Sequence, residues 1–164
     1  EPLTVAQNLP DIDGMVIVTT PQDVALLDSR KSITFANSLK VDVIGIIENM
    51  SGYAINGKAT AGTELEIAGP GGKTHKATAD DNGDWSVTLD IFKSGGGEKT
   101  ATEFNVPFLG KLPFDPGFVR GGDDGVHRIV SEPEGASSQA FSSVVSKIQN
   151  FVETEDTNGG LEII

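Results

Sequence analysis

The sequence predicts an α/β fold with a partial parallel sheet, flanking helices and a small antiparallel β insertion. Two observations lead to this prediction. Residues 14–49 contain an apolar strand pattern, an amphipathic helix pattern and a second apolar strand pattern, which together indicate a βαβ unit with parallel strands. Residues 54–89 contain short alternating segments separated by glycine-rich turns, which is typical of antiparallel strands.

Composition excludes several classes of function. The 164 residues include 12 basic and 24 acidic side chains, for a net charge of −12 at pH 7, which argues against nucleic acid or an anionic membrane as a partner. There is no cysteine, so this polypeptide offers no disulfide, no thiolate nucleophile and no cysteine ligand for a metal or cluster. No apolar run approaches the ~20 residues of a membrane span. We therefore expect a cytoplasmic protein.

The first part of the chain supplies the βαβ unit. A short helix is expected at residues 1–9, followed by a β-branched strand at 14–20. Pro21 suits the first turn of a helix, and apolar residues at helical spacing predict an amphipathic helix over residues 22–39. The almost wholly apolar run 41–49 is typical of a strand that is buried on both faces of a parallel sheet.

The predicted insertion has three or four antiparallel strands. Its alternating segments are residues 64–68, 74–79 and 84–89. The pair Asn82-Gly83 between two of them predicts a type I′ hairpin turn. The acidic residues around this pair have a little of the spacing of a calcium loop, but the distal glutamate and helical flanks of an EF-hand are missing, so the turn is the preferred interpretation.

The last part of the chain returns to the α/β pattern. A glycine-rich loop is expected to open a short helix, followed by a buried strand, a helix of one or two turns, a long amphipathic helix and a mobile polar tail. The corresponding ranges are 94–97, 98–104, 107–113, 117–121, 135–155 and 154–164.

Neither glycine–lysine string fits a phosphate-binding P-loop, which needs a glycine five positions before Gly-Lys-Thr. Gly72-Lys73-Thr74 has Ile67 at that position and runs into a strand, which favours a hairpin turn. In the string 97–100 a glutamate stands where the motif requires the glycine before Lys-Thr, and its charge would also repel phosphate. We interpret it as a loop and helix start, with a functional hinge as the alternative. His75 and His127 have no cysteine partner and no nearby histidine, so we interpret them as surface residues.

Two polar residues each come just after a predicted buried strand. Asn49 ends the run 41–49, and Asp115 follows the strand 107–113. Either residue alone is typical of a turn. Because the carboxyl ends of parallel strands meet at one edge of a sheet, we expect the two side chains to share a ligand-binding edge.

Four ordered motifs resemble the C-terminal half of the Mrp/ApbC family, which are MinD-like P-loop ATPases that carry iron–sulfur clusters. The motifs are Val-Ile-Val-Thr-Thr-Pro-Gln-Asp-Val-Ala-Leu from residue 16, Ile-Ile-Glu-Asn-Met-Ser-Gly from 46, Phe-Lys-Ser-Gly-Gly-Gly-Glu-Lys-Thr-Ala from 92 and Pro-Phe-Leu-Gly-Lys-Leu-Pro-Phe-Asp-Pro from 107. The resemblance implies a partial ATPase domain over residues 1–53 and 90–153, with 54–89 as the insertion. It also implies that ATP is the cofactor, with Asn49 at the adenine base and Pro113, Phe114 and Asp115 forming the adenine–ribose wall.

The departures from this family shape the expected function. The resemblance places the family's phosphate loop and magnesium-binding aspartate upstream of residue 1, and its cysteine pair near residues 55–58, where this chain has none. We therefore expect a truncated ATP-binding iron–sulfur cluster carrier without catalysis and without a cluster of its own. Whether the chain is an enzyme stays open, because the parent family is an ATPase.

The insertion suggests an alternative function. Residues 62–89 resemble the strand repeat of a bacterial immunoglobulin-like module, which would make the protein a non-enzymatic scaffold or interaction module that displays this insertion. The family resemblance implies iron–sulfur apoproteins as partners. A partial parallel sheet also leaves a free edge strand, which favours association, so we expect either a homodimer or a rearranged sheet.

Overall fold

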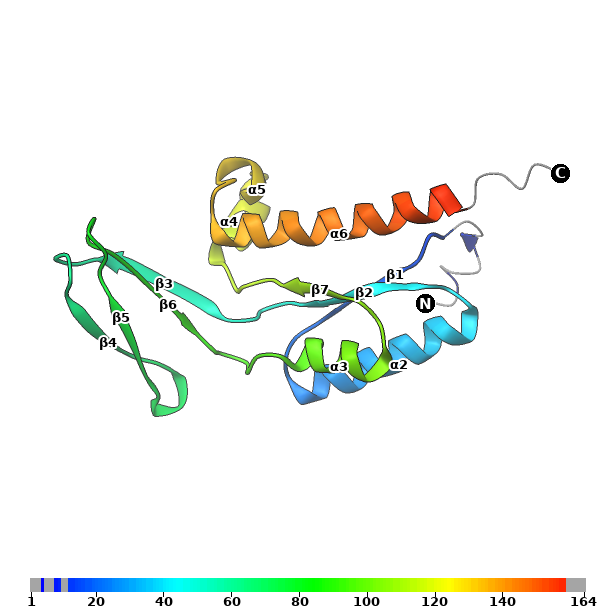
Figure 1. Ribbon diagram of the computed structural model, residues 1–164, viewed down its shortest axis with the longest axis horizontal. Helices are drawn as coiled ribbons and strands as arrows, with labels where there is room; N and C mark the ends of the chain where they lie inside the picture. The colour runs from blue at the N-terminus through cyan, green and yellow to red at the C-terminus, as the bar shows by residue number, and fades with distance from the viewer. Residues whose placement is uncertain (1–3, 5–7, 10–11, 159–164) are drawn as a thin grey trace.

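The computed structural model describes residues 4, 8–9 and 12–158, and its centre is a three-stranded parallel sheet (Figure 1). The strand order is β1–β2–β7, from β1 (Met15–Thr19), β2 (Val43–Glu48) and β7 (Phe108–Lys111). Helix α2 (Asp23–Leu39) connects β1 to β2. The predicted parallel sheet and its βαβ unit are therefore confirmed. The helix expected at residues 1–9 falls largely outside the described residues.

Strand β2 is buried on both of its faces, as its composition predicts. Helices α2 and α3 (Gly96–Phe104) lie on one side of the sheet and α6 (Ala136–Asn158) on the other (Figure 1). The core on the α2 and α3 side contains Ile17, Ile33, Ile46 and Ala101, and the core on the α6 side contains Ile47, Leu109 and Val144. Because successive strand residues point to opposite faces, neighbouring isoleucines of β2 fill two different cores.

Residues 53–89 form an antiparallel ribbon that projects beyond the α/β part (Figure 1). Strand β3 (Tyr53–Lys58) pairs with β6 (Asp84–Leu89), and β4 (Glu64–Ala68) pairs with β5 (Thr74–Thr78). The predicted antiparallel strands are confirmed, and the four strands are divided between two two-stranded sheets. The single-turn helix η1 (Pro70–Gly72) connects β4 to β5, so the glycine–lysine string 72–74 lies at a hairpin turn, as predicted.

The turn between β5 and β6 is not the predicted type I′ turn. That type requires positive φ at both Asn82 and Gly83, but in the segment 80–83 only Gly83, at 79°, has a positive φ. The Gly83 N–H donates to the Asp80 carbonyl over 2.9 Å, and Asp80 Oδ1 accepts from the N–H groups of Asn82 and Asp84. This is a type I turn followed by a left-handed glycine, because the Asp80 carboxylate stabilises the tighter turn.

The C-terminal helices are longer and more numerous than predicted. Helix α4 (Pro116–Asp124) extends three residues beyond the expected short helix, and α5 (Arg128–Ser131) was not predicted. Helix α6 continues to Asn158 and so includes the start of the segment expected to be a mobile tail, while residues 159–164 lie outside the described residues. No helix in the described part of the chain is long and apolar enough to cross a membrane.

Candidate functional site

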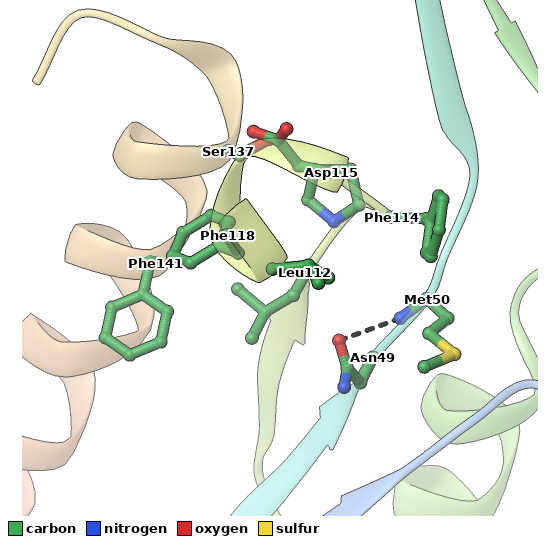
Figure 2. A pocket seen from close by; sticks show the side chains of 10 residues that line it. Asn49, Met50, Leu112, Phe114, Asp115, Phe118, Ser137 and Phe141 are labelled. Atoms are coloured by element: carbon green, nitrogen blue, oxygen red, sulfur yellow. Dashed lines mark hydrogen bonds between the residues drawn. The ribbon is translucent and has the colours of Figure 1, made fainter. Parts of the chain in front are cut away.

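A cavity of about 300 Å³ lies beyond the carboxyl ends of β2 and β7. Its wall includes all four residues predicted to form the site, Asn49, Pro113, Phe114 and Asp115 (Figure 2). The remaining lining residues come from the two strand ends and from α4 and α6, and sequence reasoning missed them: Met50, Leu112, Phe118, Val119, Ser137 and Phe141. The fold places the ends of the two strands at one edge of the sheet, and ligand binding at that edge stays a prediction.

Asn49 is held at the cavity by backbone and side-chain hydrogen bonds. Its N–H donates to the Thr19 carbonyl of β1 over 2.7 Å, which continues the sheet by one residue. Its Oδ1 accepts from the Met50 N–H at 2.9 Å, and Met50 adopts a left-handed φ of 54° (Figure 2). The side-chain oxygen therefore stabilises a sharp turn out of the sheet. Among the described residues, the amide NH₂ group of Asn49 has no hydrogen-bond partner.

Aromatic rings give the cavity flat, apolar walls. Phe118 of α4 and Phe141 of α6 lie with ring centroids 6.1 Å apart and planes inclined by 31°. Phe114 contacts Tyr53 of the ribbon edge-on, with centroids 5.7 Å apart. An apolar cavity with a few polar groups at its rim is the usual form of a small-molecule site, and aromatic faces stack on planar heterocycles such as nucleic acid bases.

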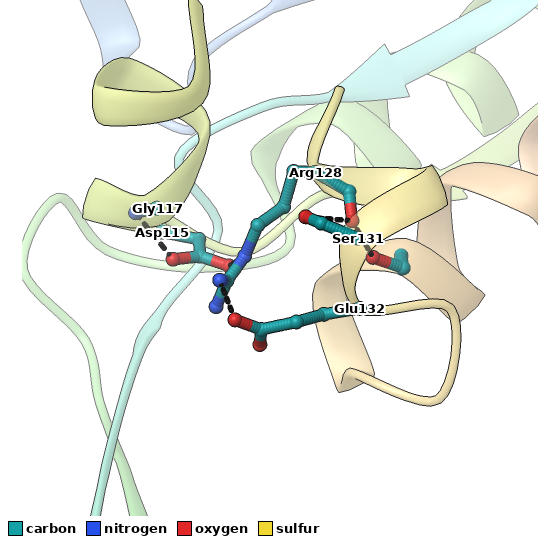
Figure 3. A network of polar contacts seen from close by, with 6 residues as sticks. Asp115, Gly117, Arg128, Ser131 and Glu132 are labelled. Carbon is teal, nitrogen blue, oxygen red and sulfur yellow. Dashed lines mark hydrogen bonds and ion pairs between the residues drawn. The ribbon is translucent and has the colours of Figure 1, made fainter. Parts of the chain in front are cut away.

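Asp115 organises the far side of the cavity as the N-cap of α4. Its Oδ1 accepts from the Gly117 N–H at 2.7 Å, and its Oδ2 lies 3.3 Å from Arg128 Nε (Figure 3). Arg128 also forms an ion pair with Glu132 (Figure 3). Burial raises the pKa of Asp115, but the hydrogen bonds from Gly117 and Ser137 and the charge of Arg128 outweigh this effect, so the pKa lies below its ordinary value. The residue is a carboxylate at neutral pH.

Replacing Asp115 with asparagine is expected to lower the free energy of unfolding by about 1 kcal/mol at neutral pH, because α4 loses the negative charge at its N-terminus and Arg128 loses its ionic partner. Because the pKa of Asp115 is lower in the folded state, its carboxylate stabilises the fold at pH values above the unfolded pKa of about 3.9. This stabilisation is lost as the pH falls through the folded-state pKa. Urea unfolding should therefore show a difference from wild type that narrows towards about pH 3.

The control for this prediction is Asp81→Asn, because Asp81 is exposed in a turn of the ribbon. Its stability should follow that of the wild type at both pH values. A difference for Asp115→Asn that stays constant between neutral and acid pH would mean that its ionisation is not coupled to folding.

The comparisons with known proteins identify the family. A family model described as ParA, the NUBPL iron-transfer P-loop NTPase, matches residues 1–82 and 82–149. The chain belongs to this family. The resemblance to iron–sulfur cluster carriers of the Mrp/ApbC type is thereby supported, as is nucleotide binding at the level of the family.

Curated relatives of this NUBPL-family chain are named iron–sulfur cluster carrier proteins. Those of Methanococcus maripaludis and Methanocaldococcus jannaschii are 35% and 36% identical over 153 residues, covering 93% of this chain and 43% of each relative. The Synechocystis protein is 39% identical over 150 residues, covering 92% of this chain and 35% of the relative. The chain thus spans less than half the length of the curated relatives it matches.

Solved structures similar to the NUBPL-family chain have the MinD fold. The cell division ATPase MinD of Pyrococcus furiosus has a TM-score of 0.52 at 17% identity, over 84% of this chain and 43% of that protein. The septum site-determining protein MinD of Pyrococcus horikoshii, complexed with Mg-ADP, has a TM-score of 0.50 at 18% identity, over 90% of this chain and 43% of that protein. These similarities confirm the predicted fold class.

The residues of this NUBPL-family chain do not fit a thiolate-bound iron–sulfur cluster. The sequence has no cysteine, and the described residues include no group of three or more histidine, cysteine, aspartate or glutamate side chains that could hold a metal ion. His75 is half-buried in the ribbon, where it occupies the space beside Gly69, and His127 is exposed just before α5. His75 is thus less exposed than the surface interpretation expects.

Proposed function

We propose that this chain binds the adenine and ribose of a nucleotide at the ends of β2 and β7, as part of an ATP-dependent iron–sulfur cluster carrier. The observation that carries the proposal is the convergence of Asn49, Pro113, Phe114 and Asp115 on one apolar cavity. Membership of a P-loop NTPase family supports a nucleotide as the ligand. The names of the curated relatives support iron–sulfur cluster carriage as the activity of the whole protein.

Each group in the cavity has a role in this proposal. The Asn49 NH₂ donates to a ring nitrogen of the base, because its oxygen is already used by Met50. The rings of Phe118 and Phe141 provide apolar contact for the base. Pro113 and Phe114 enclose the ligand from the β7 side, and Asp115 lies at the ribose, where the remaining lone pairs of its carboxylate can accept from a hydroxyl group.

The contribution of these 164 residues is base recognition rather than hydrolysis or cluster binding. The sequence has no Gly-x-x-x-x-Gly-Lys-Ser/Thr string to hold phosphates and no cysteine to hold a cluster. The proposed partners are iron–sulfur apoproteins and a second copy of this chain. The edge of β1 supports the second copy, because β1 is the outer strand of its sheet among the described strands and its Val18 is 58% exposed.

Calorimetric titration tests the proposal. The wild-type chain should bind adenosine and ATP at millimolar concentration, with little effect of Mg²⁺ because the phosphates are not held. Asn49→Ala should weaken binding about fivefold, which corresponds to the loss of one hydrogen bond of about 1 kcal/mol. Asn56→Ala, an exposed position in β3, is the matched control and should bind as the wild type does.

Two results would contradict the proposal: no heat from the wild type with millimolar ATP, or unchanged binding by Asn49→Ala. The first would favour the alternative function, a non-enzymatic scaffold that displays the immunoglobulin-like insertion. That alternative is supported by the way the ribbon projects from the α/β part (Figure 1).

A further inference from the structure

Glu48 is the only charged side chain in the described part of the chain that is fully buried, with 0% of its surface exposed. A buried carboxylate is costly by several kcal/mol unless its oxygens accept hydrogen bonds. Three groups donate to it: Ser51 Oγ to Oε1 at 2.5 Å, the Gly95 N–H to Oε1 at 3.0 Å and the Gly97 N–H to Oε2 at 2.7 Å. All three are donors, which is the arrangement that a carboxylate needs.

Along the chain, one of the three donors precedes the ribbon and the other two follow it. Ser51 comes just before the first ribbon residue, whereas Gly95 and Gly97 follow its last strand and open α3. The carboxylate of Glu48 therefore holds the segment that enters the ribbon and the segment that leaves it. Its three hydrogen bonds attach both segments to the middle strand of the sheet.

The segment that enters the ribbon also contacts the wall of the cavity. The Glu48 carbonyl accepts from the N–H of Leu112 at 2.8 Å, and Leu112 lines the cavity. The Gly52 carbonyl accepts from the Phe114 N–H at 2.7 Å, and Tyr53, the first residue of β3, contacts the Phe114 ring. Asn49 lies within the turn that the hydrogen bond from Ser51 to Glu48 closes.

We propose that Glu48 is a positioning residue for the cavity: its carboxylate holds the turn 49–52 and the glycine loop 94–97 in the geometry that presents Asn49 and Phe114 to a nucleotide base. This inference rests on the proposed function. If the hydrogen bonds of Glu48 favour binding in the cavity, binding in the cavity must in turn stabilise those hydrogen bonds, because the coupling between two sites is reciprocal. Adenosine in the cavity slows hydrogen exchange at Gly95 and Gly97, although neither residue lines the cavity.

The test uses Glu48→Gln in the full 164-residue chain, with amide hydrogen exchange and adenosine titration followed by NMR. Glutamine keeps the shape but replaces one acceptor oxygen with an NH₂ group that faces a donor. We expect the Gly95 and Gly97 amides to exchange about tenfold faster, adenosine to bind about fivefold more weakly or worse, and the side-chain NH₂ resonances of Asn49 to shift. Glu64→Gln, at an exposed position in β4, is the control.

The outcomes separate this inference from the proposed function. Faster exchange with unchanged Asn49 resonances and unchanged adenosine affinity would overturn the positioning role, leaving Glu48 a purely structural residue. If the wild type does not bind adenosine, the proposed function fails, and the Asn49 resonances alone decide whether Glu48 positions that side chain. If Glu48→Gln does not fold, Ser51→Ala, which removes one donor and leaves the glycine loop attached, must shift the same resonances or the proposal fails.

Discussion

Replacing Ile46 with alanine is expected to lower the free energy of unfolding by about 2–5 kcal/mol, the usual loss for a large aliphatic side chain in a packed core. Ile46 is 0% exposed and lies at the centre of the core formed by β1, β2, α2 and α3. The shortened side chain leaves a cavity among Ile17, Ile33 and Ala101, which the rigid middle strand cannot close. Urea unfolding followed by circular dichroism measures the loss.

The matched control for Ile46 is Val18→Ala in the neighbouring strand. The Val18 side chain is 58% exposed, and substitutions at exposed positions usually change stability by no more than about 0.5 kcal/mol. Equal losses at the two positions would show that β2 is not the centre of the core.

Replacing Gly97 with valine is expected to lower the free energy of unfolding by at least about 2 kcal/mol, through overpacking and the loss of hydrogen bonds to a buried carboxylate. A Cβ at this position would lie 3.0 Å from Glu48 Cβ and 3.3 Å from Glu48 Oε2. The two further methyl groups of valine would force the loop away from the carboxylate. Thermal unfolding should show a clear fall in melting temperature.

Gly122→Val is the control for this second prediction. Gly122 is also a helical glycine, in α4, but it is exposed and a Cβ there would meet nothing within 4 Å. Its melting temperature should stay close to that of the wild type. A comparable fall for both variants would mean that contact with Glu48 does not account for the loss at Gly97.

The glycine-rich loop is explained in part by close packing. A Cβ on Gly96 would lie 2.6 Å from Leu26 Cδ1 and 3.0 Å from the Pro21 carbonyl oxygen, so this glycine is needed where α3 approaches α2. Gly95 has a φ of 85°, a backbone conformation that favours glycine even where there is room for a side chain. The interpretation of this string as a loop and helix start is confirmed by α3, which begins at Gly96. The functional hinge stays a prediction.

Most of the α/β framework could be predicted from local patterns. The buried strand β2 and the helix α2 have strong periodic signals, and a strand–helix–strand order leaves little choice but parallel pairing. The placement of Asn49 and Asp115 at one cavity also follows, because parallel strands end at the same edge of the sheet. Their binding of a nucleotide stays a proposal.

Local periodicity was enough to predict the parallel sheet, the ribbon and the two strand ends at the candidate site, because each depends on a pattern within a short segment. The contacts between distant segments become visible only in the folded protein. The rings of Phe118 and Phe141 reach the cavity because α4 and α6 pack beside it. The role of Glu48 could not be predicted from the sequence, because two of its three hydrogen-bond donors lie 47 and 49 residues away along the chain. A local pattern cannot contain such contacts, because they form only when the chain folds back on the sheet.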